Sequence, residues 1–203
     1  MATTIEKKQN LKGGEWLIKD THFSDVFIPE GWSEEQQMIA QTCDDFIENE
    51  VKPVVARMDS MKEPEIMPEL LRKAGELGLL AAGLPESYEG MGLDFQTVML
   101  LTERLGPGHS FSVGFSAHTG IGTLPTLYFG TEAQKQKYLP KLASGEWMAS
   151  YCLTEPGSGS DALGAKSTAV LNEAGTPYIL NGQKIWITNA GFPHLFTVFA
   201  KLD

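Results

Sequence analysis

The chain has 203 residues, of which 42% are hydrophobic and 21% charged, and its net charge is −10 at pH 7. That length suffices for one or two domains with a substantial core. The negative net charge argues against nucleic acid as a partner. No apolar run reaches the roughly 18 residues of a membrane-spanning helix. Two cysteines occur, Cys43 and Cys152. We expect both to be reduced, packed thiols.

Residues 1–32 form a lead segment with scattered aromatic side chains and little periodicity. Residues 1–13 lack the apolar stretch of a secretion signal and the arginine-rich pattern of an organelle-import sequence. We therefore expect a cytoplasmic protein, or one of the mitochondrial matrix if the source is eukaryotic.

Helical periodicity begins at Ser33, which is predicted to form a capping box with Gln36. Pro53 should kink or end this first helix. A face of acidic residues on that helix has no histidine beside it, so we predict a solvated surface and no metal site.

Three further helical segments are predicted over residues 68–80, 94–105 and 110–129. The second of them is expected to bury Phe95, Val98, Met99, Leu101 and Leu105. The third is nearly uncharged, which predicts a helix that is buried all round. A second capping box, formed by Thr131 and Gln134, opens a last helix that ends at Gly145.

Beyond Gly145 the hydrophobic period changes from about 3.6 to 2, which predicts strands. They cover residues 147–154, 165–171, 178–180, 183–188 and 195–201, and Asn181-Gly182 predicts a type I′ hairpin. Helices first and strands second indicate an α+β multidomain chain, because the two kinds of element are segregated. After the lead segment we expect an all-α domain over 33–147 and the first strands of a β-barrel-like or β-sandwich domain over 148–203.

The turn after the first predicted strand, YCLTEPGSGSD at residues 151–161, gathers hydroxyls and backbone N–H groups that suit an anionic or hydrogen-bonding ligand. Gly157, Gly159 and Ala162 also fit a loose dinucleotide pattern, but that motif needs a helix where a strand is predicted. A nucleophile elbow is absent, because no glycine pair brackets Ser158 or Ser160. A loop without a ligand stays an alternative.

The same stretch, together with NGQKIWITNAG at residues 181–191, resembles the acyl-CoA dehydrogenase family of flavoproteins. Further matching words are GTEAQK at 130–135, LPESYEG at 84–90 and Asn49-Glu50-Val51, in the family's order and spacing. The words LPKLASGE and FTVFAK are most similar to the very-long-chain branch. The resemblance implies a helical domain, a central β-domain and a second helical domain, with FAD between the last two.

The resemblance also implies which residues hold the FAD: Tyr151, Cys152, Leu153, Thr154, Gly159, Ser160, Trp186, Ile187 and Thr188. Thr154 would offer donors to the pyrimidine side of the flavin, Trp186 would flank the ring, and Thr188 would lie near N5. A flavin that accepts hydride gains negative charge, which fixed donors stabilise. Ser160 would also meet the thioester end of the substrate. For Trp186, a half-buried strand aromatic is the alternative.

The implied reaction is α,β-dehydrogenation of fatty acyl-CoA thioesters in β-oxidation, in which a carboxylate removes the α-proton and the β-hydrogen leaves as hydride. No glutamate of residues 1–203 falls on a position that the family uses as the base, and Glu155 is expected to cap its loop. We therefore expect an N-terminal fragment that ends inside the β-domain, is inactive alone, binds no stoichiometric flavin, and has its catalytic base downstream of Asp203.

Val113, Gly114 and Ala117 stand where the resemblance places bulkier polar side chains of medium-chain relatives. Small apolar residues there would leave the substrate tunnel open to long acyl chains, although close helix packing explains them equally well. The resemblance further implies an electron-transferring flavoprotein as electron acceptor, a homodimer or homotetramer, and peripheral membrane association of the full-length enzyme.

Three other functions stay open. An acyl-CoA oxidase would reoxidise the flavin with oxygen, and a scaffold member of the same fold would have no dehydrogenase activity. A serine hydrolase would combine Ser158 or Ser160 with His118 and Asp161. We expect His118 and His109 to be structural, because neither is paired with a nucleophile.

Overall fold

The computed structural model describes residues 11, 13–22 and 25–202. They belong to two compact units, Met1–Ile39 and Ala40–Asp203. Most of residues 1–13, on which the expectation about a leader rests, lie outside the described part. Within that part, no helix combines the length and the apolarity that crossing a membrane requires.

The first unit contains a short helix α1 (Glu15–Ile18), a 3₁₀ turn η2 (Pro29–Gly31) and the start of α2 (Glu34–Phe46). The capping box at the start of α2 is confirmed: the Ser33 N–H donates to Gln36 Oε1 at 3.0 Å, and the Gln36 N–H donates to Ser33 Oγ at 3.1 Å. These two bonds satisfy N–H groups that have no partner inside the helix.

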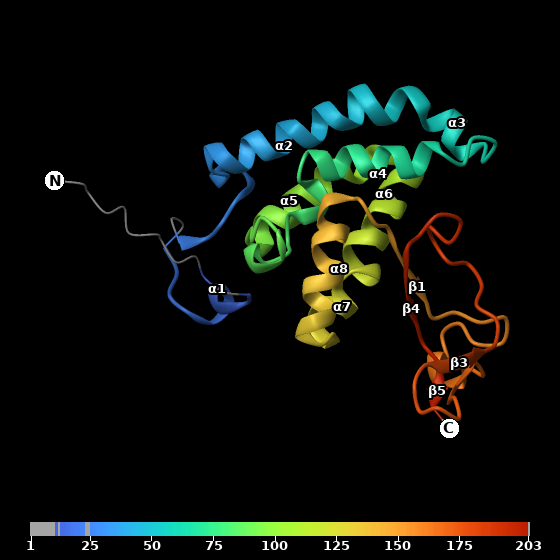
Figure 1. Ribbon diagram of the computed structural model, residues 1–203. Coiled ribbons are helices and arrows are strands. Elements are labelled where there is room, and N and C mark those ends of the chain that lie inside the picture. The colour runs from blue at the N-terminus through green and yellow to red at the C-terminus, as the bar shows by residue number, and fades with distance from the viewer. Residues whose placement is uncertain (1–10, 12, 23–24, 203) are drawn as a thin grey trace. The chain divides into compact units, whose positions relative to one another are not determined.

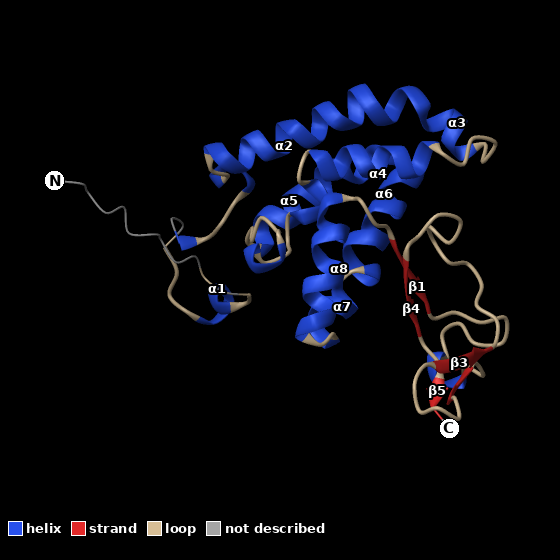
Figure 2. Ribbon diagram, viewed as in Figure 1, coloured by secondary structure: helices blue, strands red, loops and turns tan. Residues whose placement is uncertain are grey.

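Helix α2 does not continue as a regular α-helix through Pro53. It passes into a π-helical turn η3 (Ile47–Val51), a 3₁₀ turn η4 (Lys52–Val54) and then α3 (Val55–Asp59). Figure 2 shows α2 and α3 joined by helical ribbon. Proline has no N–H to give to the helical ladder, so the turns around it change their hydrogen-bond spacing. The prediction that Pro53 interrupts this helix is confirmed.

Helix α4 (Ile66–Glu76) begins two residues before the predicted start and is shorter than predicted. Its end is set by Gly78, whose φ of 77° is left-handed and which therefore terminates the helix. The predicted extension to Leu80 is wrong, because Leu79–Ala81 form a separate 3₁₀ turn, η5.

The remaining helices of the second unit follow in sequence. They are η6 (Glu86–Tyr88), α5 (Phe95–Leu105), η7 (Gly106–Gly108), α6 (Ser110–Ser116), the π-helix η8 (Ala117–Gly122), α7 (Leu124–Phe129) and α8 (Glu132–Ser144). The Asp94 side chain caps α5 by accepting the Thr97 N–H at 2.8 Å. The predicted capping box of Thr131 and Gln134 opens α8.

Two predictions of burial are wrong. Phe95 and Met99 of α5 are exposed, and the segment 110–129 is not buried all round, since Val113, Tyr128 and Phe129 are 59%, 66% and 87% exposed. These helices pack through one face only, which in α5 carries Thr97, Leu100, Leu101 and Leu105. The opposite face is left uncovered by the described residues of this unit.

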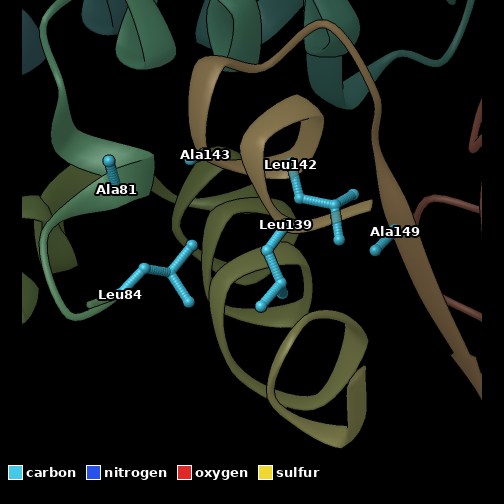
Figure 3. Packing of buried hydrophobic residues seen from close by; sticks show 6 residues of the cluster. All are labelled: Ala81, Leu84, Leu139, Leu142, Ala143 and Ala149. Carbon is cyan, nitrogen blue, oxygen red and sulfur yellow. The ribbon is translucent and has the colours of Figure 1, made fainter. Parts of the chain in front are cut away.

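One apolar cluster of the core packs the C-terminal half of α8 against η5, the residue Leu84 and the start of the first strand. Leu139, Leu142 and Ala143 of α8 pack with Ala81, Leu84 and Ala149 (Figure 3). Full burial of a leucine side chain stabilises a fold by roughly 1.5–3 kcal/mol. This cluster joins the last helix to the first strand, because Ala149 opens β1 (Ala149–Cys152).

The strands form two small sheets, which lie toward the C-terminus in Figure 1. In the first, β1 pairs in parallel with β4 (Leu195–Val198). In the second, β2 (Thr168–Leu171) pairs antiparallel with β3 (Tyr178–Asn181) and in parallel with β5 (Lys201–Leu202). A helical part followed by strands confirms the predicted fold class. The predicted strand 195–201 is divided, since β4 and β5 belong to different sheets.

Residues 183–188 are not a strand, and the type I′ hairpin at Asn181-Gly182 is wrong. This segment bonds to the loop after β1, where the Ile185 N–H donates to the Thr154 carbonyl oxygen at 2.9 Å and Lys184 Nζ donates to the Leu153 carbonyl oxygen at 3.0 Å. Because its backbone and its lysine are engaged there, β3 pairs with β2 across the turn at 172–177 instead.

Candidate functional site

The two segments singled out in the sequence, 151–160 and 186–188, are brought together by hydrogen bonds. The Ile185 N–H reaches the Thr154 carbonyl oxygen, and Ser150 Oγ donates to the Thr188 carbonyl oxygen at 2.8 Å. Tyr151 and Cys152 lie on β1, whereas Leu153 and Thr154 begin the loop and are half-buried. The segments therefore form adjoining parts of one surface.

A cavity of about 540 Å³ opens beside the second segment. Ile187, Thr188 and Asn189 form one wall, and Val113 and Gly114 of α6 form another. Ser110 of α6 also contributes, and the rest of the lining comes from α3, α4 and nearby loops: Met58, Asp59, Met61, Glu63, Pro64, Met67, Ala190, Gly191 and Phe192. Methionine, proline, valine and phenylalanine make the lining largely apolar, which suits a flexible hydrocarbon chain.

Not every predicted site residue reaches this cavity. Gly159 and Ser160 are exposed on the loop, and Ser160 does not line the cavity. Ala117 is buried in η8, one turn beyond Gly114, and also lies outside the lining. Cys152 is buried, and this burial raises the pKa of its thiol.

Trp186 presents its side chain to solvent. It is 86% exposed and has a φ of 55°, which is rare for a bulky residue. The alternative of a half-buried strand aromatic is wrong, since Trp186 lies in no strand and is not half-buried. Trp186 follows Ile185, whose N–H bonds to the carbonyl oxygen of the half-buried Thr154, and it precedes the half-buried Thr188 by two residues.

Glu155 holds the loop after β1 in shape. Its carboxylate accepts the N–H groups of Lys166 at 2.6 Å and Ser167 at 3.0 Å, and it pairs with Lys184 Nζ at 2.7 Å. These hydrogen bonds, of which the one from the Lys166 N–H has the largest effect, hold the pKa of the Glu155 carboxyl well below its usual range. The expectation that Glu155 caps its loop is confirmed.

A Glu155→Gln variant is expected to lower the thermal midpoint of unfolding by several degrees, because the ion pair with Lys184 and one of the acceptor oxygens are lost. The depressed pKa stabilises the fold above pH 4.5, the unfolded value, and this stabilisation disappears as the pH falls below it. Thermal melts at neutral pH and at acidic pH measure both effects. The exposed Glu173 gives the control Glu173→Gln, and equal midpoints for all three proteins would contradict the capping role.

His118 is structural, as predicted, and has no access to a nucleophile. The Ala149 N–H donates to its Nδ1 at 3.0 Å, so Nε2 carries the proton and donates it to the Leu142 carbonyl oxygen at 3.0 Å. The side chain is 1% exposed, and burial lowers its pKa from 6.5 to about 4.

The serine hydrolase alternative finds no support in this geometry. Ser158 Oγ donates to the Asp161 carbonyl oxygen at 2.5 Å, and both nitrogens of His118 are occupied elsewhere. The loop is followed by a 3₁₀ turn, η9 (Ala162–Gly164), and then by β2, so neither an elbow nor the helix of a dinucleotide motif is present. Burial raises the pKa of the Cys43 thiol to about 12, which makes it a poor nucleophile.

No cluster of three metal-ligating side chains occurs among the residues that the structure describes. The carboxylates at the cavity are already engaged: Asp59 Oδ1 accepts Ser110 Oγ–H at 2.6 Å, and Glu63 pairs with Arg57. The Arg57 hydrogen bond lowers the pKa of Glu63.

Sequence reasoning missed the methionine wall of the cavity and the role of Ser150. Met58, Met61 and Met67 carry no motif, and only the folding of α3 and α4 beside α6 brings them to Val113. For Asn189 the residue type itself was a local indication of a turn, because asparagine tolerates the left-handed conformation. Its φ of 65° lies in that region.

The described chain thus joins a helical part to small sheets and has an apolar cavity beside a loop that carries an exposed tryptophan and half-buried threonines. The family model "Acyl-CoA dehydrogenase, N-terminal domain" matches residues 33–146, and "Acyl-CoA dehydrogenase, middle domain" matches residues 150–203. The chain belongs to the acyl-CoA dehydrogenase family.

Individual relatives agree with this assignment. The chain is 54% identical over 192 residues to a probable acyl-CoA dehydrogenase of Bacillus subtilis, which covers 95% of this chain and 32% of the relative. It is 42% identical to the very long-chain specific acyl-CoA dehydrogenase of Macaca fascicularis, over 81% of this chain and 26% of the relative.

A solved structure, the acyl-CoA dehydrogenase of Bacillus anthracis complexed with FAD, superposes with a TM-score of 0.88 at 51% identity, covering 95% of this chain and 33% of that one. The chain thus spans about a third of the length of the Bacillus subtilis and Bacillus anthracis proteins.

Proposed function

We propose that the protein containing this chain is an FAD-dependent acyl-CoA dehydrogenase that introduces a double bond between the α and β carbons of a fatty acyl-CoA thioester. The observation that carries this proposal is the cavity: Ile187 and Thr188, which the family resemblance places at the flavin, line the same apolar space as Val113 and Gly114. A ring held by the first pair would therefore lie next to a chain held by the second.

The residues present fit a flavin. Trp186 offers an exposed aromatic face, Thr154 and Thr188 offer hydroxyls, and a side chain at Gly157 or Gly159 would meet nothing within 4 Å, so the loop leaves open space for a ligand. FAD would supply the acceptor for the hydride. The protein would supply fixed donors for the charge that the reduced ring gains.

Apolar lining residues would hold the acyl chain and exclude water from it. We propose long acyl chains, because valine and glycine at 113 and 114 narrow the cavity little and the methionines opposite them can adapt to a chain. Similarity to a very long-chain specific relative supports this choice, although short-chain specific relatives match at 37% and 38% identity.

We propose that the catalytic base lies in the part of the protein that this chain does not contain, and that the chain is inactive by itself. At the cavity, Glu63 is paired with Arg57, which lowers its pKa, and Asp59 accepts a hydrogen bond from Ser110. Both are poorly suited to remove an α-proton, because a base should have a pKa near the working pH. Electrons would pass to an electron-transferring flavoprotein in a homodimeric or homotetrameric cytoplasmic enzyme.

The test uses the full-length protein. We expect it to purify with one FAD per chain and to oxidise palmitoyl-CoA at least about tenfold more efficiently than butyryl-CoA. The 203-residue chain alone should bind no stoichiometric flavin. Faster turnover of butyryl-CoA would contradict the long-chain assignment, and hydrogen peroxide released in step with product would show an acyl-CoA oxidase instead.

A further inference from the structure

The loop that follows Trp186 is held by two buried side chains that the family resemblance did not single out. Asn189 is 8% exposed, and its Nδ2 donates to the Gly114 carbonyl oxygen at 2.9 Å. Ser150 of β1 is fully buried, and its Oγ donates to the Thr188 carbonyl oxygen at 2.8 Å. Consecutive residues of the loop are therefore tied to a strand and to a helix.

These ties matter because the loop has an unfavourable backbone. Trp186 has a positive φ of 55°, and such a conformation of a bulky residue persists only where the surroundings impose it. Asn189 also has a positive φ, at 65°, which asparagine tolerates. No regular strand or helix includes residues 186–190. The two side-chain bonds thus anchor the cavity-lining part of this loop at Thr188 and Asn189, in addition to the backbone hydrogen bonds of the loop.

The contact at Gly114 is close. A Cβ atom built on Gly114 would lie 3.1 Å from Asn189 Oδ1 and 2.8 Å from Met67 Sδ. A glycine on α6 therefore lets the Asn189 amide reach the helix backbone. Through this bond the wall formed by Ile187 and Thr188 is fixed relative to the wall formed by Val113 and Gly114.

We propose that Asn189 and Ser150 are positioning residues that set where the flavin-facing loop 186–188 lies relative to the acyl cavity. This inference rests on the proposed function and deepens it. Neither side chain needs to touch the reacting atoms. Each acts through the backbone of the loop, Asn189 by bonding to α6 and Ser150 by bonding to the Thr188 carbonyl oxygen.

Two substitutions in the full-length protein remove the side-chain hydrogen bonds without disfavouring the backbone conformation of the loop. Asn189→Gly removes the amide but favours the left-handed φ, and Ser150→Ala removes the hydroxyl with little change in volume. Each is expected to weaken FAD binding about tenfold, measured by fluorescence titration of the apoprotein, because a buried hydrogen bond is lost. Each should also speed hydrogen exchange at residues 186–192 about tenfold, while exchange in α8 stays unchanged.

The double variant should weaken binding by less than the product of the two single effects, since both bonds restrain neighbouring residues. Asn181→Ala on β3 and Ser116→Ala on α6 replace exposed residues of the same types and should leave both readouts unchanged.

Unchanged FAD affinity in both variants, or faster exchange spread over the whole protein, would overturn the positioning role while leaving the proposed function intact. A wild-type protein that binds no FAD would instead refute the proposed function and this assignment together. Because exchange in α8 is measured in the same samples, a variant that has merely lost its fold is recognised as such.

Discussion

Replacing His118 with alanine is expected to lower the free energy of unfolding by about 3 kcal/mol, because it leaves two buried backbone groups without partners and opens a small cavity. The groups are the Leu142 carbonyl at the end of α8 and the Ala149 N–H at the start of β1. Urea unfolding at neutral pH measures the loss. The control His109→Asn replaces an exposed histidine with φ 53° and ψ −126°, the conformation of a type II′ turn, in which asparagine is common.

The same histidine makes stability depend on pH. Its pKa falls from 6.5 to about 4 on folding, so between these pH values the unfolded chain carries a proton on this histidine and the folded chain does not. Stability should therefore be complete above pH 6.5 and decline as the pH falls toward 4, by about 3 kcal/mol in total. In the His118→Ala variant the part of this decline between pH 6.5 and about 5 should disappear. An unchanged slope between pH 6.5 and about 5, above the range in which carboxylates titrate, would show that His118 is not the group responsible.

The second large effect concerns substrate length. A Val113→Trp variant should fill the cavity from the α6 side and lower kcat/KM for palmitoyl-CoA about a hundredfold, while butyryl-CoA is affected only a few-fold. Val113 is largely exposed and lines the cavity, so the larger side chain has room to enter without disturbing the core. Steady-state kinetics of the full-length protein with both substrates measure the ratio.

Ile121→Trp provides the matched control for this variant. Ile121 is an exposed apolar residue on the following π-helix η8 and does not line the cavity. Equal losses for both substrates in Val113→Trp would mean that the substitution perturbs the reaction site in general. No loss for either would remove this cavity from the acyl path.

The sequence predicted the helix boundaries well where they depend on particular residue types, such as capping residues and proline. Both capping boxes are present, and Pro53 interrupts its helix, because each depends on residues within one turn of the chain. The burial of α5 was harder to predict, since several rotations of an apolar helix satisfy its periodicity and only packing selects one. Phe95 and Met99 lie on the face that the described part of the chain leaves uncovered.

The strand region shows the limit of local reasoning more clearly. Asn181-Gly182 has the residues of a type I′ turn, yet Lys184 reaches Glu155, 29 residues away, and this engagement keeps residues 183–188 out of the sheet. His118 likewise finds partners 24 and 31 residues away. No spacing rule shows such pairs in a single sequence. Family resemblance indicated the flavin-facing segments, but the cavity wall of Met58, Met61 and Met67 appears only after folding.

The most direct test of the central proposal is to add palmitoyl-CoA to the purified full-length protein without oxygen and to record its visible spectrum. We predict that the absorption of oxidised flavin is bleached within the mixing time and that the α,β-unsaturated acyl-CoA appears in equal amount. A protein that carries flavin whose spectrum stays unchanged with every acyl-CoA, or one that carries no flavin at all, would contradict the account.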